Sequence, residues 1–167
     1  MMIEASASSG CPMAVALCHS CGWNGLERDE EKAFEMYLKI EKETNGDHWA
    51  QYMLGVCYRS GFGTDQDHNK AFEFFTKSAE QGNILAMYSV GYCYKVGFGC
   101  DQNQTKAFEL YEKSVKLGFS YAMCNVGNHY EEGWGVTKDL NQAKKWFTKA
   151  AAQGLVEAQA KVDELNK

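Results

Sequence analysis

The sequence lacks several features that mark other classes of protein. Its 167 residues include a single proline, Pro12, so little in the chain forbids long helices. No apolar run approaches the roughly 18 residues that a membrane-spanning helix needs. The charges form no block of one sign, and a net charge of -5 leaves no basic stripe of the kind that nucleic acids require. We therefore expect neither a membrane span nor a nucleic-acid interface.

The chain also lacks a recognisable signal peptide and an even number of cysteines. Its start, MMIEASASSG, contains no basic residue and no long apolar segment. A fully disulfide-bonded secreted framework needs an even cysteine count, whereas this chain has seven. Both observations favour free thiols in a reducing compartment, and we expect a cytoplasmic protein. The cysteines are Cys11, Cys18, Cys21, Cys57, Cys93, Cys100 and Cys124.

What the sequence does contain is an internal repeat. The segment GFGTDQDHNKAFEFFTKSAEQGN begins at Gly61, and related segments begin at Gly97 and Gly133, a step of 36 residues each time. A column of alanines keeps the same step at Ala14, Ala50, Ala86, Ala122 and Ala158. Five points on one register indicate a repeat protein, and a composition that is 45% hydrophobic is sufficient for a buried core.

Each repeat unit has the pattern of two helices. Ala50 and Leu54 share one helical face, and Gly55 beside them is costly in a helix unless the partner helix approaches closely. The Gly61-Phe62-Gly63 turn ends this first helix, because glycine accepts the left-handed conformation. The second helix is expected to begin near His68 to Ala71 and to bury Ala71, Phe75 and Ala79. One such hairpin cannot bury its apolar faces alone, so neighbouring units must stack.

These residues resemble the Sel1-like repeat of the tetratricopeptide-type solenoids. The resemblance rests on Ala50-x-Tyr52-x-Leu54-Gly55-x-x-Tyr58-x-x-Gly61-x-Gly63, then Lys70-Ala71-x-x-Phe74-Phe75-x-Lys77-Ser78-Ala79-x-x-Gly82. It implies an all-α fold, a right-handed αα superhelical solenoid of helix-turn-helix repeats with a 36-residue period. The single solenoid domain, residues 1–167, is expected to comprise a trailing second helix (1–9), repeats at 10–45, 46–81, 82–117 and 118–153, and a final first helix (154–167).

Two local patterns have a chemical interpretation as well as a structural one. The glycine-rich turn could cradle a phosphate, but a helix precedes it, no lysine-serine pair follows, and the turn occurs three times. Cys18 and Cys21 form a Cys-x-x-Cys, yet no second Cys/His pair completes a zinc site. Cys21, Cys57 and Cys93 share a repeat column with His129, which favours packing. We therefore expect a helix-to-helix turn, no metal and no cofactor, with Phe62 and Trp134 holding the turn onto its own hairpin.

A groove lined by the first helices is the remaining candidate site. The resemblance implies that peptides lie on this face, at positions off the packing stripe, where aromatic residues and methionine suit protein recognition. Arg59 and Lys95 share a column, and with Asn125 and Asn128 they form a row of hydrogen-bond donors that suits an acidic side chain or a C-terminal carboxylate. The expected partner-binding residues are Arg59, Lys95, Asn125, Asn128, Tyr52, Met53, Val56, Tyr88, Tyr92 and Glu132. Wider members of the same face include Trp49, Leu85, Tyr121 and Cys124.

The sequence thus predicts a non-enzymatic adaptor or scaffold that binds protein or peptide segments in its concave groove. Two alternatives stay open: a regulatory repeat domain of a larger multidomain signalling protein, and a cysteine-rich enzyme or metal-binding protein. The second alternative follows from bacterial members of the family, which carry a disulfide in each repeat and are linked to β-lactam binding. The second helices expected here contain no cysteine, and the chain has no Ser-x-x-Lys.

Thiol counting separates the adaptor from the cysteine-rich alternative. If the cysteines only pack, native mass spectrometry will show no bound metal, and all seven cysteines will be alkylated after unfolding without reductant. A bound metal, or fewer reactive thiols before reduction than after it, would revive the enzyme or metal interpretation.

Overall fold

The computed structural model describes residues 12–22 and 27–166. These residues form helices and no strand, which confirms the predicted all-α fold. The helices are α2 (Pro12–Cys21), α3 (Glu30–Glu43), α4 (His48–Ser60), α5 (His68–Glu80), α6 (Ile84–Val96), α7 (Gln104–Lys116), α8 (Ala122–Glu132), α9 (Leu140–Ala152) and α10 (Val156–Glu164). The helix expected at residues 1–9 lies outside the described residues.

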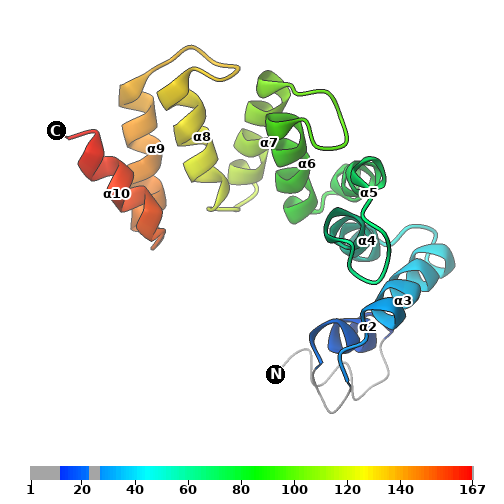
Figure 1. The fold of residues 1–167 in the computed structure, drawn as a ribbon. Coiled ribbons are helices and arrows are strands. Elements are labelled where there is room, and N and C mark those ends of the chain that lie inside the picture. The colour runs from blue at the N-terminus through cyan, green and yellow to red at the C-terminus, as the bar shows by residue number, and fades with distance from the viewer. Residues whose placement is uncertain (1–11, 23–26, 167) are drawn as a thin grey trace. The chain divides into compact units, whose positions relative to one another are not determined.

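The helices divide into two compact units. Unit 1 is residues 1–83 and holds α2 to α5, and unit 2 is residues 84–167 and holds α6 to α10. Within each unit, a first helix packs on the second helix that follows it: α4 on α5 in unit 1, then α6 on α7 and α8 on α9 in unit 2 (Figure 1). The predicted helix-turn-helix repeat is therefore confirmed, whereas one continuous domain with the boundaries given above stays a prediction.

The second helices begin at an acidic or amide side chain that caps them. Asp67 and Asp139 each accept hydrogen bonds from the backbone N–H groups two and three residues later. Asp29 and Asn103 accept from the N–H three residues later. Such caps satisfy N–H groups that have no partner within the helix. The bonds from the backbone hold the pKa of Asp67 below its ordinary value.

The first helices end at glycines in the left-handed conformation, as expected. Gly61 has φ 72° and Gly133 has φ 76°, and each donates its N–H to the carbonyl four residues earlier. The aromatic residue that follows, Phe62 or Trp134, donates to that same carbonyl. Paired bonds of this kind satisfy carbonyls at the helix end. The glycine-rich segment is thus a helix-to-helix turn.

The second glycine of the turn rests on the preceding repeat. A Cβ at Gly63 would overlap the backbone of Glu30, the first residue of α3. A Cβ at Gly135 would overlap the backbone of Gln104, the first residue of α7. Both glycines also have positive φ. Glycine at this position therefore lets the turn of one repeat lie against the second helix of the repeat before it.

The aromatic residue between the two glycines contacts the preceding repeat as well. The Arg28 guanidinium lies 5.7 Å from the centroid of the Phe62 ring. The Trp134 ring meets His129 of its own hairpin at 5.8 Å, but Lys95 of the preceding repeat also lies over it at 5.2 Å. The rings thus hold the turn to its own hairpin, as expected, and they also join two successive repeats.

The paired helices approach so closely that glycine is required between them. Added Cβ atoms would stand 2.5 Å from Phe75 at Gly55, 2.9 Å from Tyr111 at Gly91 and 2.6 Å from Phe147 at Gly127. Real Cβ atoms do not come this near to a ring. The predicted close approach of first and second helices is therefore confirmed, and an aromatic ring of the second helix fills the space at each glycine.

Two details of the expected core are wrong. At the end of α5 the buried residue is Ser78, and Ala79 is only half-buried. The Ser78 hydroxyl is held inward because it donates a hydrogen bond to the carbonyl of His48 at the start of α4. In α2 the buried cysteine is Cys18, and Cys21 is exposed at the helix end. The alanine column itself is buried throughout.

The glycine-aromatic contact predicts a coupled effect on stability. Gly127→Ala should lower the free energy of unfolding by about 1–3 kcal/mol, because overpacking against Phe147 outweighs the better helix propensity of alanine. Chemical denaturation of Gly127→Ala with and without Phe147→Leu measures the coupling. We expect Phe147→Leu to reduce the cost of the alanine.

The control is Gly118→Ala, where a Cβ would meet nothing within 4 Å and the cost comes from a φ of +96° alone. Phe147→Leu should leave that cost unchanged. Strictly additive costs for Gly127→Ala and Phe147→Leu would contradict the contact.

Candidate functional site

The ten residues expected to line a groove fall in both units. Four lie on α4 of unit 1, three lie on α6 of unit 2, and three lie on α8 of unit 2. Each set is therefore considered within its own unit. The residues on α4 are Tyr52, Met53, Val56 and Arg59; those on α6 are Tyr88, Tyr92 and Lys95; and those on α8 are Asn125, Asn128 and Glu132.

In unit 1, the α4 residues take part largely in packing. The Tyr52 ring lies 5.8 Å from the Phe75 ring, and Met53 packs against the core formed by α2, α3 and α4. The exposed Arg59 places its guanidinium 5.9 Å from the centroid of the same Phe75 ring. Burial raises the pKa of Tyr52, and the charge of Arg59 opposes that shift. Arg59 thus covers an aromatic cluster, with Val56 half-buried on the same helix.

In unit 2, three of the expected residues come together in a groove of about 500 Å³. Tyr88 comes from α6, and Asn125 and Asn128 come from α8. The turn between α9 and α10 and the first residues of α10 complete the walls. The full lining is Tyr88, Tyr121, Cys124, Asn125, Asn128, Gly154, Leu155, Val156 and Glu157, and we call it the α8 groove.

One hydrogen bond fixes the centre of the α8 groove. The Asn125 side-chain Nδ2 donates to the Tyr88 hydroxyl at 3.0 Å. The Tyr88 ring is in turn packed against Tyr111 at 5.4 Å and Phe119 at 5.1 Å. An asparagine amide has two N–H donors and one acceptor oxygen, so Asn125 keeps hydrogen-bonding capacity in a defined orientation. Burial raises the pKa of Tyr88, which therefore stays a neutral hydroxyl.

The rim of the α8 groove exposes two large apolar side chains. Tyr121 is 61% exposed and Val156 is 84% exposed. Cys124 is half-buried in the same lining, and burial raises the pKa of its thiol. Exposed aromatic and aliphatic side chains beside oriented amides are typical of surfaces that bind other proteins.

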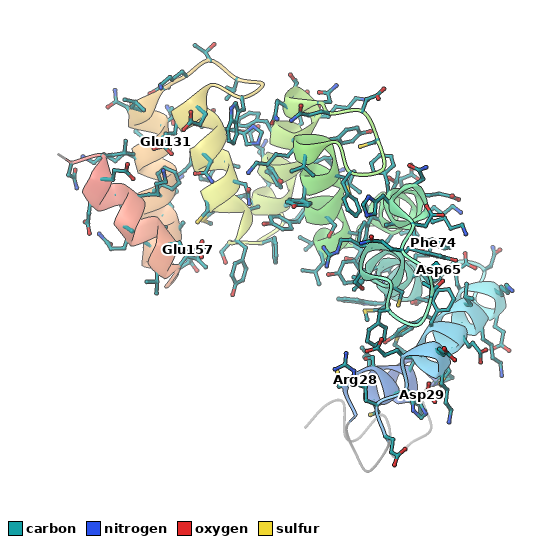
Figure 2. All side chains as sticks on the ribbon, in the orientation of Figure 1. Arg28, Asp29, Asp65, Phe74, Glu131 and Glu157 are labelled. Carbon is teal, nitrogen blue, oxygen red and sulfur yellow. The ribbon has the colours of Figure 1, made fainter. Side chains whose placement is uncertain are left out.

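An ion pair holds α10 against α8 at the far end from the groove. Lys161 of α10 lies 3.0 Å from the Glu131 carboxylate of α8, and this bond raises the pKa of Lys161. Figure 2 shows Glu131 near the end of α8 and Glu157 at the start of α10. The pair therefore fixes the helix whose first turn carries Val156 and Glu157 into the groove lining.

The remaining expected residues of unit 2 lie outside the lining of the α8 groove. Lys95 lies over the Trp134 ring, and burial lowers its pKa. Tyr92 is 44% exposed on α6, and Glu132 is exposed at the end of α8. Lys95 thus belongs to the contact between two successive repeats, because its ammonium group lies over the aromatic ring of the next turn.

Sequence reasoning missed Leu155, Val156 and Glu157. The final first helix expected at 154–167 contains these residues, but the alanine column singled out Ala158 within it. The overlooked signal is the column of Trp49, Leu85 and Tyr121, which continues after a further 36 residues to Glu157.

His129 is buried on α8, the helix that also carries Asn125 and Asn128 of the α8 groove. Its Nδ1 lies 2.7 Å from the Trp134 carbonyl, which only accepts, so Nδ1 carries the proton of the neutral ring. Its buried Nε2 has no hydrogen-bond partner among the described residues. Burial lowers the pKa of His129, and the charge of Lys95 lowers it further.

No metal site emerges from the part of the chain that the structure describes. Within residues 12–22 and 27–166, no three His, Cys, Asp or Glu side chains are grouped so as to hold a metal ion. The cysteines described there form no disulfide with one another, and Cys11 lies outside the described residues. Among the helices of those residues, none is long and apolar enough to cross a membrane.

Paired helices joined by glycine turns define a helical-repeat protein. The model of the Sel1 repeat matches residues 13–41, 50–83, 84–119 and 120–155, and the chain belongs to the Sel1 repeat family. Sel1 repeats generally act as scaffolds for protein-protein interaction. The family that the sequence resembles is thereby confirmed.

Known structures agree with this assignment. A Sel1 repeat protein from Oxalobacter formigenes is 29% identical with a TM-score of 0.85, over 92% of this chain and 61% of that one. A protective antigen of uropathogenic Escherichia coli is 29% identical with a TM-score of 0.80, over 96% of this chain and 34% of that one. Cysteine rich protein B of Helicobacter pylori, 23% identical with a TM-score of 0.60 over 80% of this chain and 94% of that one, shares the fold.

A rat protein, DAP3-binding cell death enhancer 1, is 29% identical over 82 residues. The match covers 49% of this chain and 16% of the rat protein. This chain therefore spans about a sixth of that relative's length.

The burial of neutral His129 predicts a pH-dependent stability. In the unfolded chain the His129 ring binds a proton with the ordinary pKa of 6.5, whereas burial in the folded chain lowers this pKa. The free energy of unfolding should therefore fall as the pH is lowered through 6.5. His129→Cys, which installs the residue found at Cys57 and Cys93, should flatten this slope in urea titrations.

The matched control is His68→Gln at the exposed first residue of α5, which should keep the slope. A slope that survives His129→Cys would show that another group is responsible.

Proposed function

We propose that this chain is a non-enzymatic protein-binding module, and that the α8 groove holds an extended segment of another protein. The observation that carries the proposal is the pairing of oriented amides with an exposed apolar rim. Asn125 is held by Tyr88, with Asn128 beside it in the same lining, and Tyr121 and Val156 are exposed around them.

The amides suit the backbone of a bound segment. An extended peptide presents N–H and C=O groups along its length, and an asparagine side chain matches both with its own donors and acceptor. The two asparagines lie three residues apart on α8, so they lie near one another on the helix surface. Tyr121 and Val156 then supply apolar contact for the side chains of the segment.

A second candidate is that the module serves a longer, multidomain protein. The relatives favour it, because this chain spans only 16% of the rat protein and 34% of the Escherichia coli antigen. In that case the groove would recruit a partner to the other domains. We also propose a reducing compartment such as the cytoplasm, which is supported by the lack of a disulfide among the cysteines of the described residues.

Selection of random phage-displayed peptides on the immobilised protein tests the groove. Asn125→Ala combined with Asn128→Ala should weaken the selected peptides about tenfold, since each lost hydrogen bond costs about 0.5–1.5 kcal/mol. Tyr121→Ala should weaken them as well. Fluorescence anisotropy with synthetic copies of the peptides measures the affinities.

The matched control is Asn141→Ala on α9, an exposed asparagine outside the α8 groove, which should leave binding unchanged. Circular dichroism checks that each variant stays folded. Peptides that bind equally to wild type and to the Asn125/Asn128 double variant would place the binding surface elsewhere.

A further inference from the structure

The α8 groove carries one charged residue in its lining, Glu157. We propose, as a refinement that rests on the groove being a peptide site, that the bound segment presents a lysine or arginine side chain to Glu157. This choice of partner chemistry replaces the acidic or carboxylate-bearing segment that the sequence predicted.

The negative charge of Glu157 reaches the walls of the groove. Burial raises the pKa of the Cys124 thiol and of the Tyr88 hydroxyl, both of which line the groove, and the charge of Glu157 adds to each shift. Groups whose pKa is raised by one carboxylate lie within the electric field of that carboxylate. An incoming cation therefore meets an attractive potential, and an incoming carboxylate meets a repulsive one.

The cations of unit 2 do not neutralise this carboxylate. Lys161, on the same helix, is paired with Glu131 and with Glu164. Lys95, which was expected to attract an acidic partner, lies over Trp134 and outside the groove lining. Across residues 12–22 and 27–166, no lysine, arginine or histidine forms an ion pair with Glu157.

The surroundings of Glu157 suit a long cationic side chain. Tyr121 and Val156 line the same groove and are largely exposed, so they offer apolar surface for the methylene stem of lysine or arginine. The face of an exposed tyrosine also attracts a cation. A stem on this apolar rim with its charged end at Glu157 would use both features, while Asn125 and Asn128 bind the backbone.

The peptides selected on wild type supply the probe. We expect them to share a lysine or arginine at one position, and its replacement by glutamine to weaken binding about two- to fivefold, as for an exposed ion pair. The same peptides should lose this discrimination against Glu157→Gln. Selection on Glu157→Lys should instead enrich aspartate or glutamate at that position.

The control is Glu132→Gln, which removes the same charge from an exposed residue of α8 outside the groove and should keep the preference. If peptide binding needs Asn125 and Asn128 but ignores the peptide's cation and Glu157, the charge inference is overturned and the peptide site stands. If no selected peptide depends on the asparagines, both fall. Loss of peptide binding as the protein concentration rises would point to a second copy of the chain in the groove and would also overturn the inference.

Discussion

The contact between a helix glycine and an aromatic ring is the constraint on which each unit depends. Where Gly91 faces Tyr111, the missing side chain admits the ring and sets the spacing of α6 and α7. The Tyr111 ring is fully buried, and it also packs against the Tyr88 ring at 5.4 Å. Tyr88 then accepts the hydrogen bond that orients Asn125. The spacing of α6 and α7 thus determines where the Asn125 amide of α8 lies in the α8 groove.

A second constraint joins successive repeats and holds cationic side chains at the contacts between them. The turn glycines Gly63 and Gly135 let each loop rest on the helix before it, and the aromatic residue between the glycines carries a cation from the preceding repeat. Lys95 is such a cation. Its position over Trp134 stabilises the stacking of repeats, and it is therefore not placed at the groove. The charge of Lys95, which the sequence places in a row of donors on the groove, therefore lies at the contact between two successive repeats.

The fold was predictable from sequence to a large extent, since glycine and alanine columns at a fixed step report backbone geometry directly. The helix ends and the close helix approach at Gly55 and Gly127 followed from the same columns. The caps at Asp67 and Asp139 were not predicted, and the structure shows their bonds. The first repeat was harder, because its register differs and Cys21 is exposed where the column predicts burial.

The groove was predictable only in part. Tyr88, Asn125 and Asn128 were found because they lie off the packing stripe of first helices. Whether a polar residue off that stripe faces a groove or a neighbouring loop depends on contacts between repeats, which no column within one repeat reveals. Lys95 fails for this reason, and Glu157 was missed because its column otherwise holds apolar residues.

The column that ends at Glu157 differs from the glycine column, because helix packing fixes the residue type in one and not in the other. At Gly55, Gly91 and Gly127 the repeats need the same residue, because a ring occupies the space of the side chain. At the position of Trp49, Leu85, Tyr121 and Glu157, the residue changes from aromatic to aliphatic to acidic within one chain. Helix packing does not determine this position, so its side chain can be suited to a partner. We propose that binding specificity in such a protein resides in the positions that the repeat leaves unspecified, and in this column Glu157 is where the chain places a charge.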